Sequence, residues 1–115
     1  MKIILYGQLP AKKNAWKVGR YGRVYQSKQN QLDGFIMQIL EQKGIKVGLP
    51  YEGRCKLLVD LFQSDRCDLD GQLTTLCDLL QNAGIVKNDR QIKQITAQKF
   101  IDNKEPKISL EIIEI

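Results

Sequence analysis

The sequence predicts an α+β fold in which two main helices pack on a mixed or antiparallel β-sheet. Three observations support this class: two segments repeat apolar residues with a helical period, several others are rich in β-forming residues, and 115 residues suffice for one hydrophobic core. The expected order is a strand, a β-hairpin, a helix, a strand, a helix and two strands. Because no repeat, low-complexity tract or linker interrupts the chain, we expect one domain over residues 1–115.

The amino-terminal part is predicted to form a strand followed by a hairpin. Lys2–Gln8 is rich in β-forming residues and stops before Pro10, which cannot donate a hydrogen bond to a sheet. In Trp16–Ser27, Gly19 and Gly22 permit the positive φ of a tight turn between two short arms. We therefore expect the chain to enter its first helix from a hairpin.

Two segments show the apolar period of an amphipathic helix. The first is Lys28–Lys43, which Gly44 ends, and the second runs from about Leu69 to Asn82, with Gly84 as a left-handed stop. The expected core stripe of the first helix is Leu32, Phe35, Ile36, Ile39 and Leu40. That of the second is Leu69, Leu73, Leu76, Cys77 and Leu80.

Three later segments read as strands. Arg54–Gln63 contains enough Leu, Val and Phe to be buried on at least one face. Ile92–Ile101 and Lys107–Ile115 follow the second helix and are joined by a turn at Asp102–Glu105. These strands complete the predicted sheet.

The absence of histidine excludes several kinds of active site. Ser-His-Asp and Cys-His catalysis, histidine-bound zinc or iron and an imidazole base are impossible within one chain. The three cysteines are odd in number and lack close ligand-type pairs, so we expect reduced thiols without a disulfide framework or zinc site. Any chemistry must use carboxylates, lysines, hydroxyls or thiols.

Positive charge is concentrated at the amino terminus. The formal net charge is +5, but residues 1–28 hold seven basic residues and no acid, so the 11 basic and 13 acidic residues that remain sum to −2. One surface is therefore expected to attract phosphate and another to hold a cation. The apolar stretch Ile3–Tyr6 is too short for a signal-peptide core or a membrane span, so we expect a cytoplasmic protein that does not use a membrane.

Three aspartates could form a carboxylate site. Asp68 and Asp70 lie two residues apart between a strand and a helix, and Asp89 lies between that helix and the next strand. Alternatively, Asp68 only caps the helix and Asp70 only complements its dipole. If the three carboxylates converge, hard oxygen ligands without histidine or thiolate favour Mg²⁺ or Mn²⁺ over zinc.

The segment 11–28 interleaves basic and aromatic residues, a pattern typical of contacts with bent or opened nucleic acid. Lysine and arginine would pair with phosphates, while Trp16, Tyr21 and Tyr25 could stack on unpaired bases. In the alternative interpretation, the aromatic side chains pack on the sheet and the lysines form a solvated face. Phosphate binding is expected under either interpretation.

Taken together, these motifs resemble the RusA family of Holliday junction resolvases, which are small dimeric endonucleases. The resemblance covers nearly the whole chain. Its amino-terminal motifs are Gly7-Gln8-Leu9-Pro10, Lys13-Asn14, Gly22-Arg23-Val24-Tyr25 and Ser27. Its core motifs are Arg66-Cys67-Asp68-Leu69-Asp70, then 78–85, then Asn88-Asp89-Arg90-Gln91-Ile92, and finally Lys99.

The resemblance implies a homodimer that resolves four-way DNA junctions by symmetric phosphodiester hydrolysis in recombination and repair. It implies that Asp68, Asp70 and Asp89 converge as catalytic ligands of Mg²⁺, with Mn²⁺ able to substitute, and that Lys99 belongs to the catalytic group. The branched DNA would be bound by Lys12, Lys13, Asn14, Lys17, Arg20, Arg23, Lys28 and Arg66.

Two positions depart from the family pattern. Gly71 stands where the family has Asn, and Thr74 stands where it has a Lys expected beside the scissile phosphate. Arg66, Lys87 or Lys99 could replace that cation. Two alternatives therefore remain: a binding protein of the same fold with little or no cleavage, and a nuclease for flaps or other branched DNA.

Overall fold

The computed structural model describes residues 1–11, 22–44 and 48–115, and within them it confirms the predicted class: a mixed four-stranded sheet with two helices. The strands are β1 (Lys2–Tyr6), β2 (Cys55–Gln63), β3 (Ile92–Ile101) and β4 (Lys107–Glu114). The helices are α2 (Gly22–Lys43) and α3 (Leu69–Asn82), and a 3-10 helix (Asp89–Gln91) precedes β3. The later strands and the second helix thus begin and end close to their predicted bounds.

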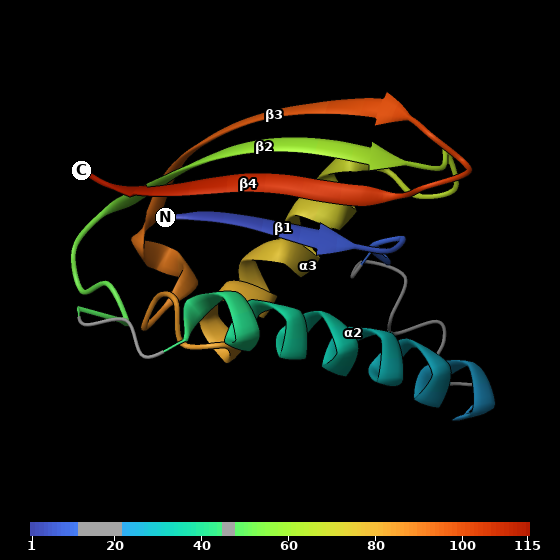
Figure 1. The fold of residues 1–115 in the computed structure, drawn as a ribbon, viewed down its shortest axis with the longest axis horizontal. Coiled ribbons are helices and arrows are strands. Elements are labelled where there is room, and N and C mark those ends of the chain that lie inside the picture. Colours follow the sequence, from blue (N-terminus) through green and yellow to red (C-terminus); the bar gives the residue numbers. More distant parts are fainter. Residues whose placement is uncertain (12–21, 45–47) are drawn as a thin grey trace.

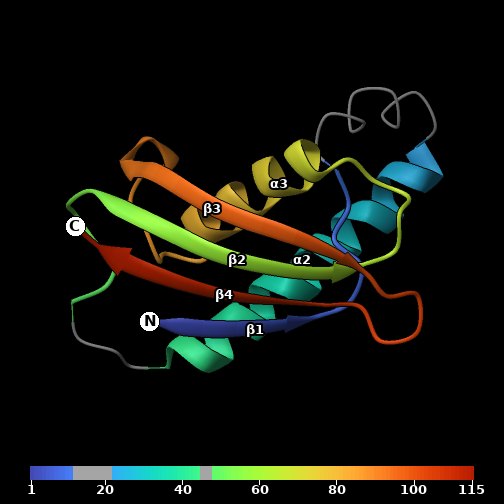
Figure 2. The same cartoon turned by 90° about the horizontal axis from the view of Figure 1, so that it is seen from above.

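The sheet has the order β1-β4-β2-β3 (Figure 2). Strands β2 and β3 are parallel and are connected through α3, whereas β4 is antiparallel to both β1 and β2. The carboxy-terminal strand therefore lies inside the sheet between β1 and β2, and β3 becomes an edge strand. This order brings the end of β1, the end of β2 and the end of β3 to the same side of the molecule.

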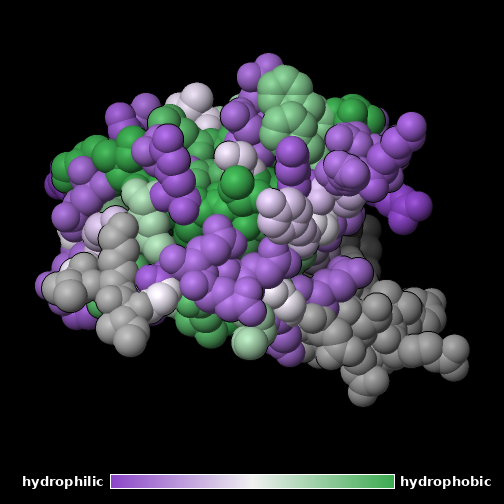
Figure 3. All heavy atoms as spheres, in the orientation of Figure 1, coloured by the Kyte–Doolittle hydropathy of each residue, from purple (hydrophilic) through white to green (hydrophobic). Residues whose placement is uncertain are grey.

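Helices α2 and α3 lie on one face of the sheet, and no helix in the part of the chain that the structure describes covers the opposite face (Figure 1). Along β2, buried residues alternate with more exposed ones, as expected when one face of a strand packs on helices. In the space-filling view, hydrophobic residues reach the surface in the band between the sheet and α2 (Figure 3). None of the helices in the described ranges is both long enough and apolar enough to cross a membrane. The largest fully buried side chains are Ile3, Leu5, Leu9, Ile39, Leu57, Leu61, Leu76, Leu79, Leu80, Ile85, Ile108 and Leu110.

The predicted hairpin is wrong in its second arm. Helix α2 begins at Gly22, so Val24–Gln26 is helical, and the helix starts six residues before the predicted Lys28. The preference of Val and Tyr for strands over helices amounts to a few tenths of a kcal/mol, which an existing helix overrides as it extends. The first arm and the turn, Trp16–Tyr21, lie outside the described residues.

The ends of the helices follow the prediction more closely than their buried faces do. Gly44 and Gly84 both adopt positive φ, at +55° and +76°, and end α2 and α3 as expected. On α3, however, the fully buried face includes the polar Gln72 and Thr75, while Leu73 and Cys77 are only partly buried. Leucines on several sides of α3 leave the direction of its buried face undetermined by spacing alone.

Candidate functional site

The loop 64–68, which connects β2 to α3, and the first turn of α3 carry the first two candidate aspartates. Asp68 occupies the N-cap position of α3 with an extended backbone (φ −72°, ψ 145°), but its side chain makes no capping hydrogen bond. Asp70 lies in the first turn, where its Oδ1 accepts a hydrogen bond from the backbone N–H of Gly71 at 2.9 Å. Both aspartates are exposed. A capping role for the Asp68 side chain is therefore not what places it here.

Lys99 approaches this loop from the sheet. It lies on β3 opposite Leu61, and its Nζ donates a hydrogen bond to the backbone carbonyl of Cys67. Since Cys67 directly precedes Asp68, the half-buried ammonium of Lys99 is held one residue away from the first candidate ligand. Lys99 and Cys67 are 32 residues apart in the chain, so the sequence alone gave no reason to expect this contact.

Asp89 opens the 3-10 helix that leads into β3. Its backbone N–H donates to Oε1 of Gln81 at 2.9 Å, and Asn88 caps the short helix in a reciprocal box with Gln91. The exposed Asp89 side chain lies at a groove of about 250 Å³ between α3 and β3. The other residues that line this groove are Leu73, Thr74, Cys77, Ile92 and Ile95.

Thr74 lies between the start of α3, which carries Asp70, and the groove that contains Asp89. Its Oγ1 donates to the backbone carbonyl of Asp70 at 3.0 Å, and its side chain lines the same groove as Asp89. Within the described residues, however, no three acidic, cysteine or histidine side chains are close enough to hold a metal ion. Helix α3 has 14 residues, so its ends are about 20 Å apart, and Asp89 lies at a groove beside the middle of the helix, at Leu73, Thr74 and Cys77.

Asp89 also affects the titration of a neighbouring thiol. Burial, followed by the charges of Asp89 and Asp78, raises the pKa of Cys77 from 9.0 to about 11. The thiol is therefore protonated near neutral pH, although it lies in the groove. Cys55, Cys67 and Cys77 are all free thiols, as expected.

Sequence reasoning missed two buried glutamines that support the loop. Gln63, at the end of β2, accepts a hydrogen bond from the N–H of Leu9 at 2.6 Å, and Gln72 on α3 donates to the carbonyl of Leu9 at 2.8 Å. The two amides also contact each other at 3.2 Å, and Gln8 accepts from the N–H of Ser64. The motif 7–10 is thus fixed to both ends of the loop that precedes Asp68. The only sign of these glutamines in the sequence is that Gln63 and Gln72 fall at positions of β2 and α3 that are otherwise apolar.

The other basic residues that the sequence proposed for the site lie in different places. Arg66 is exposed within the loop 64–68. Lys87 pairs with Glu52 at 3.3 Å on the exposed surface, an arrangement that contributes little to stability. Arg23 and Lys28 lie on α2. The remaining candidates for DNA contact, Lys12, Lys13, Asn14, Lys17 and Arg20, lie outside the described residues.

Comparisons with known proteins give the same family as the motifs. The family model described as endodeoxyribonuclease RusA matches residues 8–113. No curated protein matches the chain. The matched range contains α2, α3, the loop 64–68 and all three aspartates, and of the described elements it leaves out β1 and the last residue of β4. The chain therefore belongs to the RusA family of endodeoxyribonucleases.

Proposed function

We propose that the protein is a Mg²⁺-dependent endonuclease that acts as a homodimer and resolves four-way DNA junctions by symmetric phosphodiester hydrolysis. The family match over residues 8–113 carries this proposal. The exposed aspartates at the start of α3, with a lysine held beside them, support it. A homodimer would offer two equivalent sites, as cleavage of two symmetry-related strands requires.

The proposed metal ligands are Asp68, Asp70 and Asp89. Their donor chemistry fits a hard divalent cation, because carboxylate oxygens are the preferred ligands of Mg²⁺ and Mn²⁺. Their spacing fits less completely, because in one chain they line α3 without forming a group of three. When bound, the cation would supply polarisation of the phosphoryl oxygens and a bound water of lowered pKa.

The protein's own residues would hold the substrate and the loop in position. Lys99 fixes the loop 64–68 through Cys67, and the exposed Arg66 is available to a DNA phosphate. The basic segment would bind the junction arms through backbone contacts, which fix register without reading sequence. Its proposed residues are Lys12, Lys13, Asn14, Lys17, Arg20, Arg23 and Lys28.

One observation favours a second function, a branched-DNA-binding protein with little or no cleavage. Thr74, not lysine, lies one turn beyond Asp70, so the cation that the family places there is missing. Whether Lys99 compensates decides between the two functions. Lys99 is already engaged with Cys67, which limits how far it can reach toward a phosphate.

Incubation with a synthetic four-way junction tests the proposal. We expect paired nicks in opposite strands with Mg²⁺ and binding without nicks when the cation is chelated. A linear duplex of the same sequence is the control for structure specificity. Binding without cleavage under both conditions would support the second function, and cleavage of a flap but not of the junction would contradict junction resolution.

A further inference from the structure

The uncovered face of the sheet carries a row of stacked groups. The rings of Phe62 and Phe100 are 5.0 Å apart between centroids and inclined by only 15°. The ammonium of Lys107 lies over the Phe62 ring, 5.3 Å from its centroid. Because β2 lies between β4 and β3, Phe62 has a cation on one side and an aromatic ring on the other.

This row faces away from the helices. Leu61 and Gln63 are fully buried on the helical side of β2, so Phe62, between them, projects from the opposite face. Its partners Phe100 and Lys107 lie opposite it in the register of the adjacent strands and share that face. No element in the described ranges covers this side of the sheet (Figure 1).

The row ends in an aromatic surface that can accept another ring. One face of Phe100 stacks on Phe62, and β3 is the edge strand, so no strand among the described residues neighbours the other side of Phe100. The residue is 39% exposed, a large fraction for a phenylalanine in a sheet. A flat ring of a bound ligand could therefore stack on Phe100 and extend the row formed by Lys107, Phe62 and Phe100.

This open end lies on the opposite face of the edge strand β3 from the candidate active site. Phe100 directly follows Lys99, whose side chain leaves β3 on the helical face and contacts Cys67 in the loop 64–68. The backbone N–H of Asp102 donates to the carbonyl of Gln63, which keeps the ends of β2 and β3 together. A ring stacked on Phe100 would thus lie at the sheet edge, across β3 from the loop that carries Asp68.

We propose that Phe100 is a stacking site for an unpaired nucleobase of the DNA substrate, with Phe62 and Lys107 holding its ring in place. Aromatic side chains stack on any base, and an open four-stranded sheet backed by helices is a geometry that RNA-recognition domains use in this way. Opened junctions supply unpaired bases. The site rests on the family's DNA substrate and is independent of the metal and of junction specificity.

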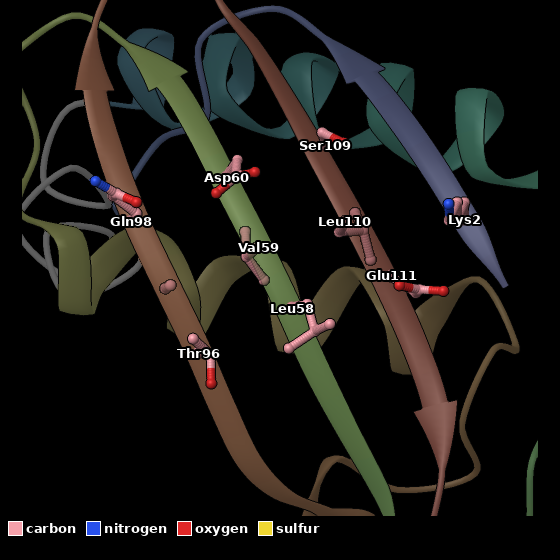
Figure 4. A pocket seen from close by; sticks show the side chains of 10 residues that line it. Lys2, Leu58, Val59, Asp60, Thr96, Gln98, Ser109, Leu110 and Glu111 are labelled. Carbon is pink, nitrogen blue, oxygen red and sulfur yellow. The ribbon is translucent and has the colours of Figure 1, made fainter.

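The neighbouring surface fits a base better than a phosphate. Figure 4 shows Asp60, Gln98 and Ser109 projecting from the same face, one row along the sheet from Phe62 and Phe100. They line a shallow pocket of about 320 Å³. The carboxylate of Asp60 can accept hydrogen bonds from the amino groups of a base but would repel a phosphate. Lys107, at the opposite end of the row, carries the charge that attracts the backbone.

Binding without catalysis tests this site. The full chain is titrated, with divalent cations chelated, against a single-stranded oligothymidylate that carries one 2-aminopurine, whose fluorescence reports stacking. Phe100→Ala should weaken binding by about 5- to 150-fold and remove most of the fluorescence change. Phe100→Trp should preserve both. Ile4→Ala, which truncates an exposed apolar side chain of β1 on the same face but outside both the row and the pocket, should bind like the wild type.

Three results would overturn the proposal. The first is that the wild type does not bind the oligothymidylate, and the second is that Phe100→Ala binds it as well as the wild type does. The third is that Phe100→Ala dissociates a dimer in sedimentation experiments while Ile4→Ala does not, which would assign the row to contact with a second copy. Cleavage of a junction is measured separately, so a failure of the stacking site can be distinguished from a failure of the proposed nuclease function.

Discussion

The ammonium of Lys99 donates a hydrogen bond to the backbone carbonyl of Cys67, and this contact ties the edge strand β3 to the loop that carries Asp68. The two residues are 32 positions apart in the chain. A charged donor on a backbone acceptor is stronger than a neutral pair, so the contact restricts where the loop can lie. We therefore expect Lys99 to position this loop.

Replacement of Lys99 by Met should lower the single-turnover cleavage rate by about 10- to 150-fold, because a hydrogen bond to a charged group contributes about 1.5 to 3 kcal/mol. Met keeps most of the chain's volume but cannot donate. Lys99→Arg is the matched variant that keeps charge and donors. Recovery with Arg but not Met would support the role, whereas a wild-type rate in Lys99→Met would contradict it.

Replacement of Asp70 by Asn should abolish cleavage and leave junction binding intact or tighter, because it removes a proposed metal ligand and one negative charge that faces phosphate. Asp65→Asn is the control, because Asp65 is an exposed acid in the adjoining loop 64–68 and outside the proposed ligand set. Nicking and mobility-shift assays on the same junction measure both effects. A wild-type rate in Asp70→Asn would remove this residue from the site, and weak binding alone would indicate a folding defect.

Local sequence signals predicted the elements of the fold better than their arrangement. The bounds of β3 and α3 followed from β-forming residues, apolar spacing and glycine stops, all of which act within a few residues. Val24 and Tyr25 misled the prediction, since their weak strand preference is overridden inside α2. The position of β4 between β1 and β2 depends on long-range pairing, which no local pattern contains.

The candidate site likewise could be predicted from the sequence only in part. Asp68 and Asp70 could be selected from their position between a strand and a helix, but their relation to Asp89 depends on how β3 returns beside α3. The supporting amides of Gln63 and Gln72 could not be predicted, because each looks like a surface glutamine until the segment 7–10 closes over it. The stack of Phe62 and Phe100 likewise needs the parallel register of β2 and β3.

The basic amino-terminal segment should dominate affinity for DNA. If it neutralises about five to seven phosphates per protomer, log K should fall against log salt with a slope of roughly −5 to −6 on duplex arms. Removal of both charges in Lys12→Ala/Lys13→Ala should reduce that slope and weaken binding to all junction sequences alike. Filter-binding titrations over a range of salt concentrations measure the slope, and a nearly flat dependence would assign DNA binding to another surface.

The Cys77 thiol should react slowly below its raised pKa. A change from 9.0 to about 11 lowers the thiolate fraction at pH 8 by about 100-fold, so alkylation should accelerate with pH up to about 11. Asp89→Asn removes one of the charges that raise the pKa and should shift this profile to lower pH. Peptide mass spectrometry after iodoacetamide treatment measures it, with unfolded protein as control. An identical profile for folded and unfolded protein would contradict the burial of this thiol beside Asp89.

The last prediction concerns Thr74, where the chain lacks the family's lysine. The structure places Thr74 on the exposed side of α3, one turn beyond Asp70 and in the groove that contains Asp89. A lysine there would not disturb the buried face formed by Leu76, Leu79 and Leu80. Its ammonium would lie between the two ends of the proposed ligand set, where charge develops on the phosphoryl group.

Thr74→Lys should therefore raise the single-turnover cleavage rate by about 100- to 1,000-fold, by analogy with a single well-placed donor worth about 2.7 to 4 kcal/mol. Thr74→Gln is the control, because it adds length without charge and should change the rate little. The gain will be smaller if Lys99 or Arg66 already supplies the cation. An unchanged rate in Thr74→Lys, combined with loss of cleavage in Lys99→Ala or Arg66→Ala, would show that the substitution at this position is already compensated. If none of these variants alters the rate, a protein cation takes no part in the chemical step, and the metal alone must stabilise the developing charge.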